Sequence, residues 1–140
     1  MGGEKSHVSI EIDAFPSDED LSELMRLSWT GDPSIPTRSY QNILSRSLTH
    51  ICAYAEGVLV GFVNVAWDGG IHAFVLDTSV HPSFRRRSIA TRLVRQAAAT
   101  ARERGAEWLH VDHEPHLRVL YAQCGFRPTS AGLIDLLANQ

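Results

Sequence analysis

The sequence has few cysteines, no long apolar run and no excess of positive charge. Cys52 and Cys124 are its only cysteines, and two are too few for the disulfide framework of a small secreted domain. No apolar stretch approaches the ~20 residues that a membrane-spanning helix needs, and the first residues contain no apolar signal region. The net charge of −3 argues against general nucleic-acid binding. These absences predict a cytoplasmic protein whose partners are neither nucleic acids nor membranes.

The chain has the length of one ordinary domain. Its 140 residues, 44% of them apolar, are enough for a hydrophobic core that needs no disulfide or metal to stabilise it. No internal repeat, low-complexity segment or long linker interrupts the sequence. We therefore expect a single domain over residues 1–140, in which residues 1–6 form a flexible terminus.

The charges are unevenly distributed along the chain. Residues 1–32 carry eight acidic and two basic side chains, whereas residues 85–104 carry seven arginines and one glutamate. Both segments are compatible with the solvent-exposed faces of helices. They are also compatible with a cationic substrate near the acidic segment and an anionic ligand near the basic one.

Apolar periodicity predicts a mixed α/β fold of the α+β type. Helix signals occupy residues 17–28, 40–48, 88–104 and 115–124. Strand patterns occupy residues 7–15, 51–67 (two strands that turn at Glu56-Gly57), 71–80, 106–111 and 133–137. The predicted order is β-α-α-β-β-β-α-β-α-β. Antiparallel strands followed by a helical crossover indicate a mixed, mostly antiparallel sheet with helices on both faces.

The strand that ends at residue 80 leads into a strongly basic helix start. The stretch VHPSFRRRSIATRLV, residues 80–94, contains three consecutive arginines followed by small residues around Ile89. A helix start presents unpaired N–H groups and a partial positive charge, and small side chains let an anion approach that backbone. Arginines add charge-assisted contacts. Residues 85–91 therefore have the parts of a phosphate-binding site, although arginines at a helix start can also serve solvation alone.

This segment resembles the acetyl-CoA signature of the GNAT N-acetyltransferase superfamily, in which Arg/Gln-x-x-Gly-x-Gly/Ala follows an apolar strand and a proline. Arg85 matches the first position and Ala90 the last, while Ser88 stands where the family usually has glycine. The stretch LYAQCGF, residues 120–126, resembles the family's Leu-Tyr-x-x-x-Gly-Phe, and GVLVGFVNV, residues 57–65, resembles its third strand. Two spaced motifs in this order make the chain similar to the family over most of its length.

The resemblance implies a GNAT-like fold and an acyltransferase that moves an acetyl group from acetyl-CoA, its co-substrate, to a primary amine. The acceptor would be a small molecule, such as an amine, amino acid, amino sugar or antibiotic, or a protein. No metal would take part, and a homodimer is compatible with this interpretation. The residues that the resemblance assigns to the coenzyme are Thr78, Val80, Arg85, Arg86, Arg87, Ser88, Ile89, Ala90, Thr91 and Tyr121.

The resemblance also implies roles in the chemistry. Tyr121 corresponds to the tyrosine that serves relatives as general acid toward the departing coenzyme A thiolate. Relatives often have a glutamate or histidine as general base on the fourth strand, where this chain has Phe74 and Leu76. The neighbouring Asp77 would orient the amine or pass its proton through water, unless it only accepts hydrogen bonds from nearby backbone N–H groups. Glu114 stands where the family often has an asparagine that contacts the coenzyme.

Relatives bind the acceptor between the first two helices and the strand ends. This implies a substrate-binding role for the region of Trp29 and for Trp67. The acidic residues near the start of the chain would suit a cationic amine.

Two other functions are compatible with the sequence. His110, His113 and His116 form His-x-x-His-x-x-His, which suggests a metal-binding module. The run crosses from a strand end through a loop to a helix start, so its ligands would not share one face. The other alternative is a module that binds an acyl-CoA without catalysis, favoured by the apolar residues at positions 74 and 76 and disfavoured by Tyr121.

Overall fold

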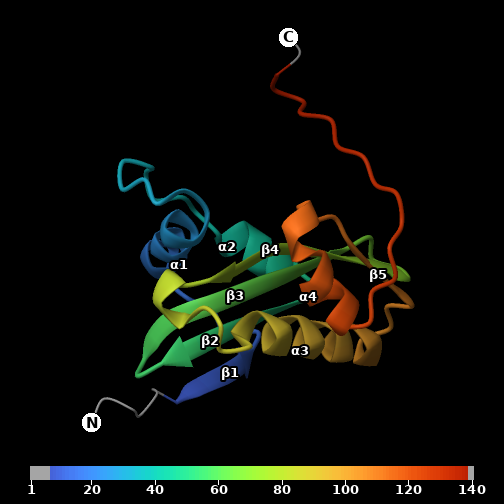
Figure 1. The fold of residues 1–140 in the computed structure, drawn as a ribbon, viewed down its shortest axis with the longest axis horizontal. Coiled ribbons are helices and arrows are strands. Elements are labelled where there is room, and N and C mark those ends of the chain that lie inside the picture. The colour runs from blue at the N-terminus through green and yellow to red at the C-terminus, as the bar shows by residue number, and fades with distance from the viewer. Residues whose placement is uncertain (1–6, 139–140) are drawn as a thin grey trace.

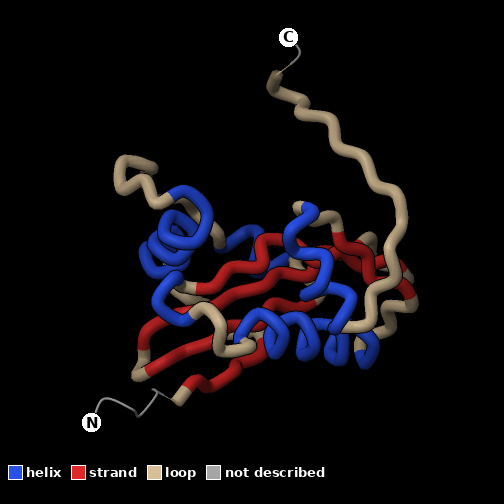
Figure 2. Tube along the Cα trace, viewed as in Figure 1, coloured by secondary structure: helices blue, strands red, loops and turns tan. Residues whose placement is uncertain are grey.

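The structure, a computed structural model, describes residues 7–138, so the terminus expected over residues 1–6 lies outside the described residues. Its centre is one sheet with the strand order β1-β2-β3-β4-β5 (Figures 1 and 2). Neighbouring strands are antiparallel from β1 to β4, and β5 runs parallel to β4. The expected mixed, mostly antiparallel sheet is confirmed. The strands are β1 Val8–Ile12, β2 Thr49–Ala55, β3 Val58–Trp67, β4 His72–Val80 and β5 Trp108–Val111.

Helices cover both faces of this sheet (Figure 1). One face carries α1 (Asp18–Met25), its π-helical continuation η1 (Arg26–Thr30) and α2 (Gln41–Arg46). The other carries α3 (Ile89–Glu103) and α4 (Arg118–Gln123). Single 3-10 turns, η2 (Pro82–Phe84) and η3 (Pro115–Leu117), precede α3 and α4. No helix within residues 7–138 combines the length and apolar character needed to cross a lipid bilayer.

Two hydrophobic cores lie on the two faces of the sheet. Because successive strand residues point to opposite faces, β2 contributes Ile51 and Ala53 to one core and Cys52 to the other. The larger core lies beneath α3, which contributes a stripe of apolar residues that includes Leu93. The smaller core lies beneath α1 and α2 and is centred on the buried Phe62.

The start of α3 packs very closely against β3 at Gly61. A Cβ atom on this glycine would lie 3.0 Å from Cδ1 of Leu93 and 3.2 Å from Cγ2 of Ile89. Gly61 pairs with Val80, the last residue of β4. The missing side chain therefore lets the first turn of α3 lie close to the end of β4, where the basic segment begins.

The α1 helix begins as its sequence predicts. The backbone N–H of Asp20 donates a 3.1 Å hydrogen bond to Oγ of Ser17, and three acidic residues occupy the first turn. The helix then widens into η1, which ends where the Gly31 N–H donates to the carbonyl of Arg26 at 2.6 Å. This continuation carries Ser28 and Trp29 toward the end of β4.

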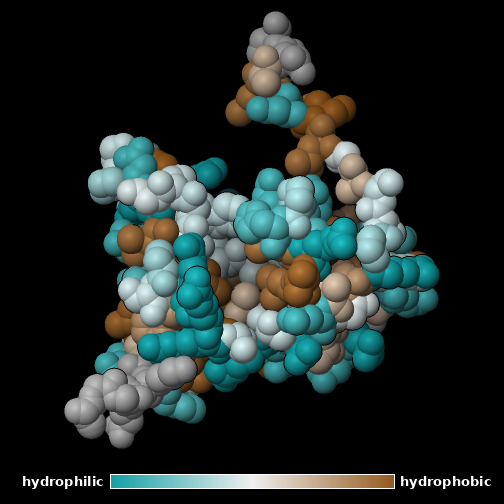
Figure 3. Space-filling view, viewed as in Figure 1, coloured by the Kyte–Doolittle hydropathy of each residue, from teal (hydrophilic) through white to brown (hydrophobic). Residues whose placement is uncertain are grey.

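The closing strand predicted over residues 133–137 is wrong. The structure has no strand there, and the segment runs away from the body of the molecule, with its apolar atoms gathered in brown in Figure 3. Leu133 is 85% exposed and Leu137 is 86% exposed. A strand needs a neighbouring edge to satisfy its N–H and C=O groups, and apolar composition alone does not supply one.

Candidate active site

A β-bulge in β4 positions the centre of the candidate site. Ser79 pairs with Phe62 and Leu76 pairs with Asn64, so two residues of β4, Asp77 and Thr78, lie opposite a single residue of β3. Asp77 adopts the left-handed conformation, with φ at 58°. The bulge turns Asp77 toward the cavity beside α1, while Thr78 faces α4 on the other side of the sheet.

On the α4 side, Tyr121 lies against this bulge. Its hydroxyl donates a 3.1 Å hydrogen bond to Oγ1 of Thr78, and its ring, only 4% exposed, stacks on His113 with a centroid separation of 5.0 Å. Burial raises the pKa of the Tyr121 phenol, and the hydrogen bond with Thr78 opposes that rise. Tyr121 is therefore protonated at neutral pH and can donate a proton.

Strands β4 and β5 separate near Tyr121. Their parallel pairing ends at Val75 and Val111, where β5 stops, while β4 continues to Val80. The last part of β4 thus has no partner strand on that side. The N–H of Val80 is engaged, since it donates to Oγ of Ser28 at 3.3 Å, and the remaining polar groups on this side of β4 face the space beside α4, which an extended ligand can enter.

The basic segment forms the start of α3, as expected. Ser88 caps the helix in the left-handed conformation, with φ at 61°, and its side chain makes no capping hydrogen bond. The N–H of Arg92 donates to the Ser88 carbonyl at 3.1 Å. Within residues 7–138, no hydrogen bond engages the N–H groups of residues 86–91. These donors and the helix dipole give the loop the features of an anion-binding site.

The three arginines of this segment have different environments. Arg85 donates from Nη2 to the carbonyl of Ser28 at 3.2 Å, which ties the loop to η1. Arg86 is exposed and has a φ of 64°. The Arg87 guanidinium lies over the ring of Phe84, 4.7 Å from its centroid, and its Nη1 is buried without a partner in the described residues. Because a buried unpaired donor is costly, Arg87 is well suited to an anionic ligand.

A cavity of about 440 Å³ lies on the opposite face of the sheet, beside Asp77. It is lined by α1, η1, the loop of residues 31–40 and the start of α2. The Asp77 carboxyl can be reached by solvent through this cavity, yet partial desolvation by the surrounding protein raises its pKa, against the attraction of Arg38. No hydrogen bond reaches this carboxylate from any residue between 7 and 138, so the backbone-bonded alternative for Asp77 is not observed.

The two tryptophans that we assigned to the acceptor have different positions. Trp29 lines the cavity, and its indole Nε1 donates to Oγ of Ser79 at 2.8 Å. Trp67 is the last residue of β3, pairs with Ala73 and does not line the cavity. The structure therefore brings only Trp29 to the neighbourhood of Asp77.

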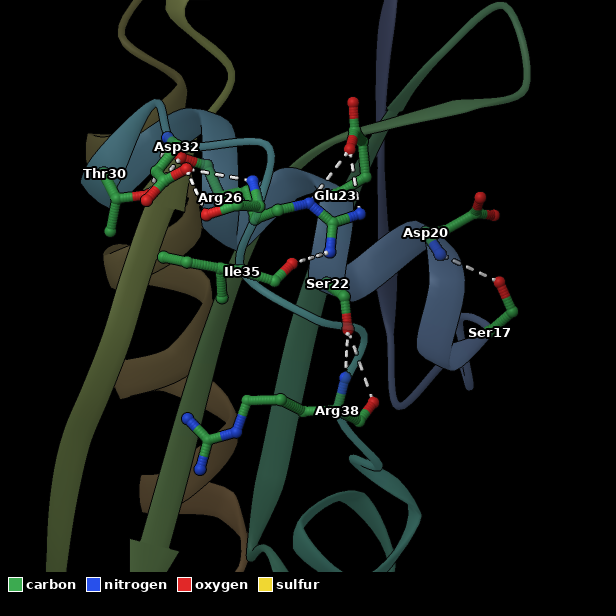
Figure 4. Close-up of polar contacts among 10 residues, drawn as sticks. Ser17, Asp20, Ser22, Glu23, Arg26, Thr30, Asp32, Ile35 and Arg38 are labelled. Carbon is green, nitrogen blue, oxygen red and sulfur yellow. Dashed lines mark hydrogen bonds and ion pairs between the residues drawn. The ribbon is translucent and has the colours of Figure 1, made fainter.

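The sequence did not reveal Arg38 as a site residue. Its backbone is held at both polar atoms, since its N–H donates to Oγ of Ser22 at 2.9 Å and the Ser22 hydroxyl donates to its carbonyl at 3.3 Å. Figure 4 shows its guanidinium directed away from these bonds, with no dashed contact of its own. The sequence around Arg38 does not show which residues lie near it in space, because contacts with α1 set the path of its loop.

The histidine motif does not form a metal site in the described residues. Nδ1 of His72 lies 3.0 Å from Nε2 of His110, whose ring stacks on Phe74, while His113 stacks on Tyr121. No group of three histidine, cysteine, aspartate or glutamate side chains within residues 7–138 is arranged to hold a metal ion. The metal-binding alternative therefore has no support in this geometry.

Comparison with known proteins identifies the family. The family model of the acetyltransferase (GNAT) family matches residues 18–126. The chain belongs to the GNAT acetyltransferase family. Its relatives include mycothiol acetyltransferase of Nocardia farcinica (strain IFM 10152), which is 31% identical over 111 residues, or 76% of this chain and 36% of the relative. The chain thus spans about a third of that relative's length.

Solved structures share the GNAT fold of this chain. A probable acetyltransferase from methicillin-resistant Staphylococcus aureus superposes with a TM-score of 0.78 at 20% identity, covering 92% of this chain and 98% of the other. An aminoglycoside N-acetyltransferase in complex with CoA gives a TM-score of 0.71 at 21% identity, covering 96% and 97%. The predicted GNAT-like fold is confirmed, and the family match supports the predicted class of enzyme, an acyltransferase.

Proposed function

We propose that this GNAT chain is an N-acetyltransferase that moves the acetyl group of acetyl-CoA to a primary amine of a small molecule. The arrangement around the β4 bulge carries the proposal. Asp77 faces a cavity on one side of the sheet, and the Tyr121 hydroxyl meets the adjacent Thr78 on the other. The amine attacks the thioester carbon from one direction while the thiolate departs from that carbon in another, so amine-binding and acid groups on two sides of one strand suit acyl transfer.

The start of α3 fits the pyrophosphate of the coenzyme. The free N–H groups of residues 86–91 and the unpaired Nη1 of Arg87 are donors without partners among the described residues. Arg85, Arg86 and Ser88 would add charge or hydroxyl contacts, while Ile89, Ala90 and Thr91 form the first helical turn. Thr78 and Val80 border the opening beside β4, where the extended arm of the coenzyme would lie.

In the chemical step, the amine nitrogen attacks the acetyl carbonyl carbon, and the carbon–sulfur bond breaks. The thiolate that leaves takes a proton or hydrogen bond from Tyr121, whose phenol stays protonated because burial raises its pKa. The amine must be neutral when it attacks, although a simple amine is mostly ammonium at pH 7. Asp77 attracts the ammonium and receives its first proton through water, since Phe74 and Leu76 cannot take one. The second proton, which the nitrogen loses as the amide forms, passes to solvent, and solvent returns a proton to Tyr121.

The resemblance to acetyltransferases of small amines supports this function. The family match spans most of the chain, and one solved GNAT structure, an aminoglycoside N-acetyltransferase, contains CoA. These similarities favour acetyl-CoA over other acyl donors in a first test.

The test is release of free thiol from acetyl-CoA in the presence of a panel of primary amines, with thermal unfolding measured alongside. We expect acetyl-CoA to raise Tm, since a ligand at 100 times its Kd adds about 2.7 kcal/mol to the free energy of unfolding. We also expect at least one amine to stimulate thiol release. A rise in Tm without any amine-dependent turnover would indicate the acyl-CoA-binding module instead. No rise with either acetyl-CoA or CoA would refute the proposed coenzyme site.

A further inference from the structure

The cavity beside Asp77 contains two opposite charges that do not neutralise each other. The Asp77 carboxylate and the Arg38 guanidinium both line it. Desolvation raises the pKa of Asp77, and the charge of Arg38, which attracts the carboxylate, opposes that rise. No ion pair or hydrogen bond joins the two groups. In residues 7–138 the guanidinium of Arg38 has no hydrogen-bond partner, so both groups are available to a ligand.

The two charges are carried by backbone segments that are held in place by different contacts. Arg38 is anchored at its N–H and carbonyl by the hydroxyl of the buried Ser22. Asp77 is held by the bulge of β4 in the left-handed conformation. Two unpaired charges of opposite sign, carried into one cavity by separately anchored backbone segments, form a complementary site for a molecule that carries both signs.

The neighbouring Arg26 does not duplicate Arg38. Its Nε and Nη2 donate to Oε1 of Glu23 at 3.3 Å and 3.0 Å, and its Nη1 donates to the carbonyl of Ile35 at 2.9 Å (Figure 4). These bonds use the guanidinium of Arg26 to hold the loop of residues 31–40 against α1. Arg38 is therefore the arginine of the cavity with open donors.

The remaining walls of the cavity combine apolar side chains with the hydroxyl residues Ser22, Thr30 and Ser39. Met25, Trp29, Ile35 and Ile43 line it, and the side chains of Trp29 and Ile43 are 57% and 42% exposed. Apolar side chains left accessible within a concave site favour a ligand with an apolar body. The volume of about 440 Å³ suits a small molecule.

We propose that the acceptor is an amino acid with an apolar side chain, whose carboxylate binds Arg38 while its amine faces Asp77. A planar carboxylate matches the parallel donors of a guanidinium, which gives Arg38 a role in specificity. The apolar side chain of the acceptor lies against Trp29 and Ile43. This inference rests on the proposed N-acetyltransferase function and narrows its substrate class.

The experiment compares acceptors that differ only in the carboxylate. We measure kcat/KM for L-phenylalanine, L-phenylalaninamide and phenethylamine at saturating acetyl-CoA. We expect phenylalanine to exceed both analogues by about 10- to 100-fold, the worth of one charge-assisted contact shielded from water. O-phosphoethanolamine tests a phosphate in place of the carboxylate, and a preference for it over phenylalanine would overturn the assignment.

Variants of Arg38 connect this preference to the cavity. Arg38→Gln should reduce the ratio of kcat/KM between phenylalanine and phenethylamine toward one, mainly through KM for phenylalanine, and Arg38→Lys should retain part of it. Arg46→Gln removes an exposed arginine of α2 that does not line the cavity, so it should leave the ratio unchanged. Circular dichroism checks that each variant is folded.

The outcomes separate this inference from the proposed function. Equal kcat/KM for phenylalanine and phenethylamine in the parent protein would overturn the inference while leaving an N-acetyltransferase. Absence of thiol release with every amine would contradict the proposed function. In that case, calorimetric titration of phenylalanine decides the inference, which requires binding to the parent protein and its loss in Arg38→Gln. No heat of binding to the parent would overturn it.

Discussion

The hydroxyl of Tyr121 lies 3.1 Å from Oγ1 of Thr78, to which it donates, and Thr78 is adjacent to Asp77 in the β4 bulge. Two residues that are 43 positions apart in the sequence thus connect α4 to the strand that contributes Asp77 to the cavity. The side chain of Asp77 leaves the bulge on one face of the sheet, and Tyr121 contacts the bulge from the other face. This geometry leads to the first prediction.

Tyr121→Phe should lower kcat strongly and KM for acetyl-CoA little. Loss of the full general-acid contribution would reduce kcat by about 10²- to 10⁴-fold, because the hydroxyl acts as charge develops on sulfur. The ring and its stacking on His113 are kept, so the variant should fold. Steady-state kinetics on an accepted amine provide the measurement. Tyr54→Phe removes a tyrosine hydroxyl from β2 and should have near-normal turnover, and the same result for Tyr121→Phe would exclude Tyr121 from the mechanism.

Arg87→Ala should weaken binding of acetyl-CoA with a modest effect on kcat. The phosphates are remote from the acetyl carbon, so the contact contributes equally to the ground and transition states. We expect KM for acetyl-CoA to rise by about 10-fold or more, as for one charge-assisted hydrogen bond. Arg102→Ala, in the last turn of α3, is the matched control. If the two variants had the same KM, the anion site would not involve Arg87.

Asp77→Asn should lower activity and stabilise the fold at neutral pH. Burial raises the pKa of Asp77 in the folded protein, so the folded state holds this proton to higher pH than the unfolded state. The free energy of unfolding therefore decreases as pH rises from the ordinary pKa, near 4, through the raised value. Asparagine does not titrate, so the gain in Tm should be present at pH 7–8 and absent well below pH 4.

The same carboxyl should shape the pH dependence of kcat/KM. As pH falls through the raised pKa, Asp77 becomes neutral and ceases to attract the amine, so the parent protein should lose activity on this acidic limb. The limb should disappear in Asp77→Asn. Asp112→Asn, an exposed carboxylate after β5, should alter neither profile. Identical acidic limbs in the parent protein and Asp77→Asn would show that another group titrates.

Ser88→Gly should stabilise the protein slightly without weakening acetyl-CoA binding. Ser88 has a φ of 61°, which costs a non-glycine residue about 1–2 kcal/mol, whereas glycine adds about 0.4–1 kcal/mol of unfolded-state entropy. The balance is a gain of about 0.5–1 kcal/mol, visible in Tm. Ser45→Gly, in α2, should instead lower Tm. A drop in Tm for Ser88→Gly would mean that the serine hydroxyl stabilises the helix start.

Local patterns in the sequence determined most of the elements and half of the site. The apolar stripe of α3, the cap at Ser17 and the basic segment 85–91 depend on residues close together in the chain, so their spacing predicts them. The motif at 120–126 likewise indicated Tyr121. These signals were sufficient for the family and for the position of the proposed coenzyme site.

Only the tertiary structure brought together the residues of the proposed acceptor side. The bulge that directs Asp77 and Thr78 to opposite faces of the sheet depends on the register between β3 and β4. The position of Arg38 depends on the hydrogen bonds between Ser22 and the Arg38 backbone. Residues 133–137 have the composition of a strand but form none, because a strand requires a neighbouring edge that the segment itself does not encode. Contacts between residues far apart in the sequence leave no periodic pattern in it. The unpaired charges of the cavity could therefore be recognised only in the folded structure.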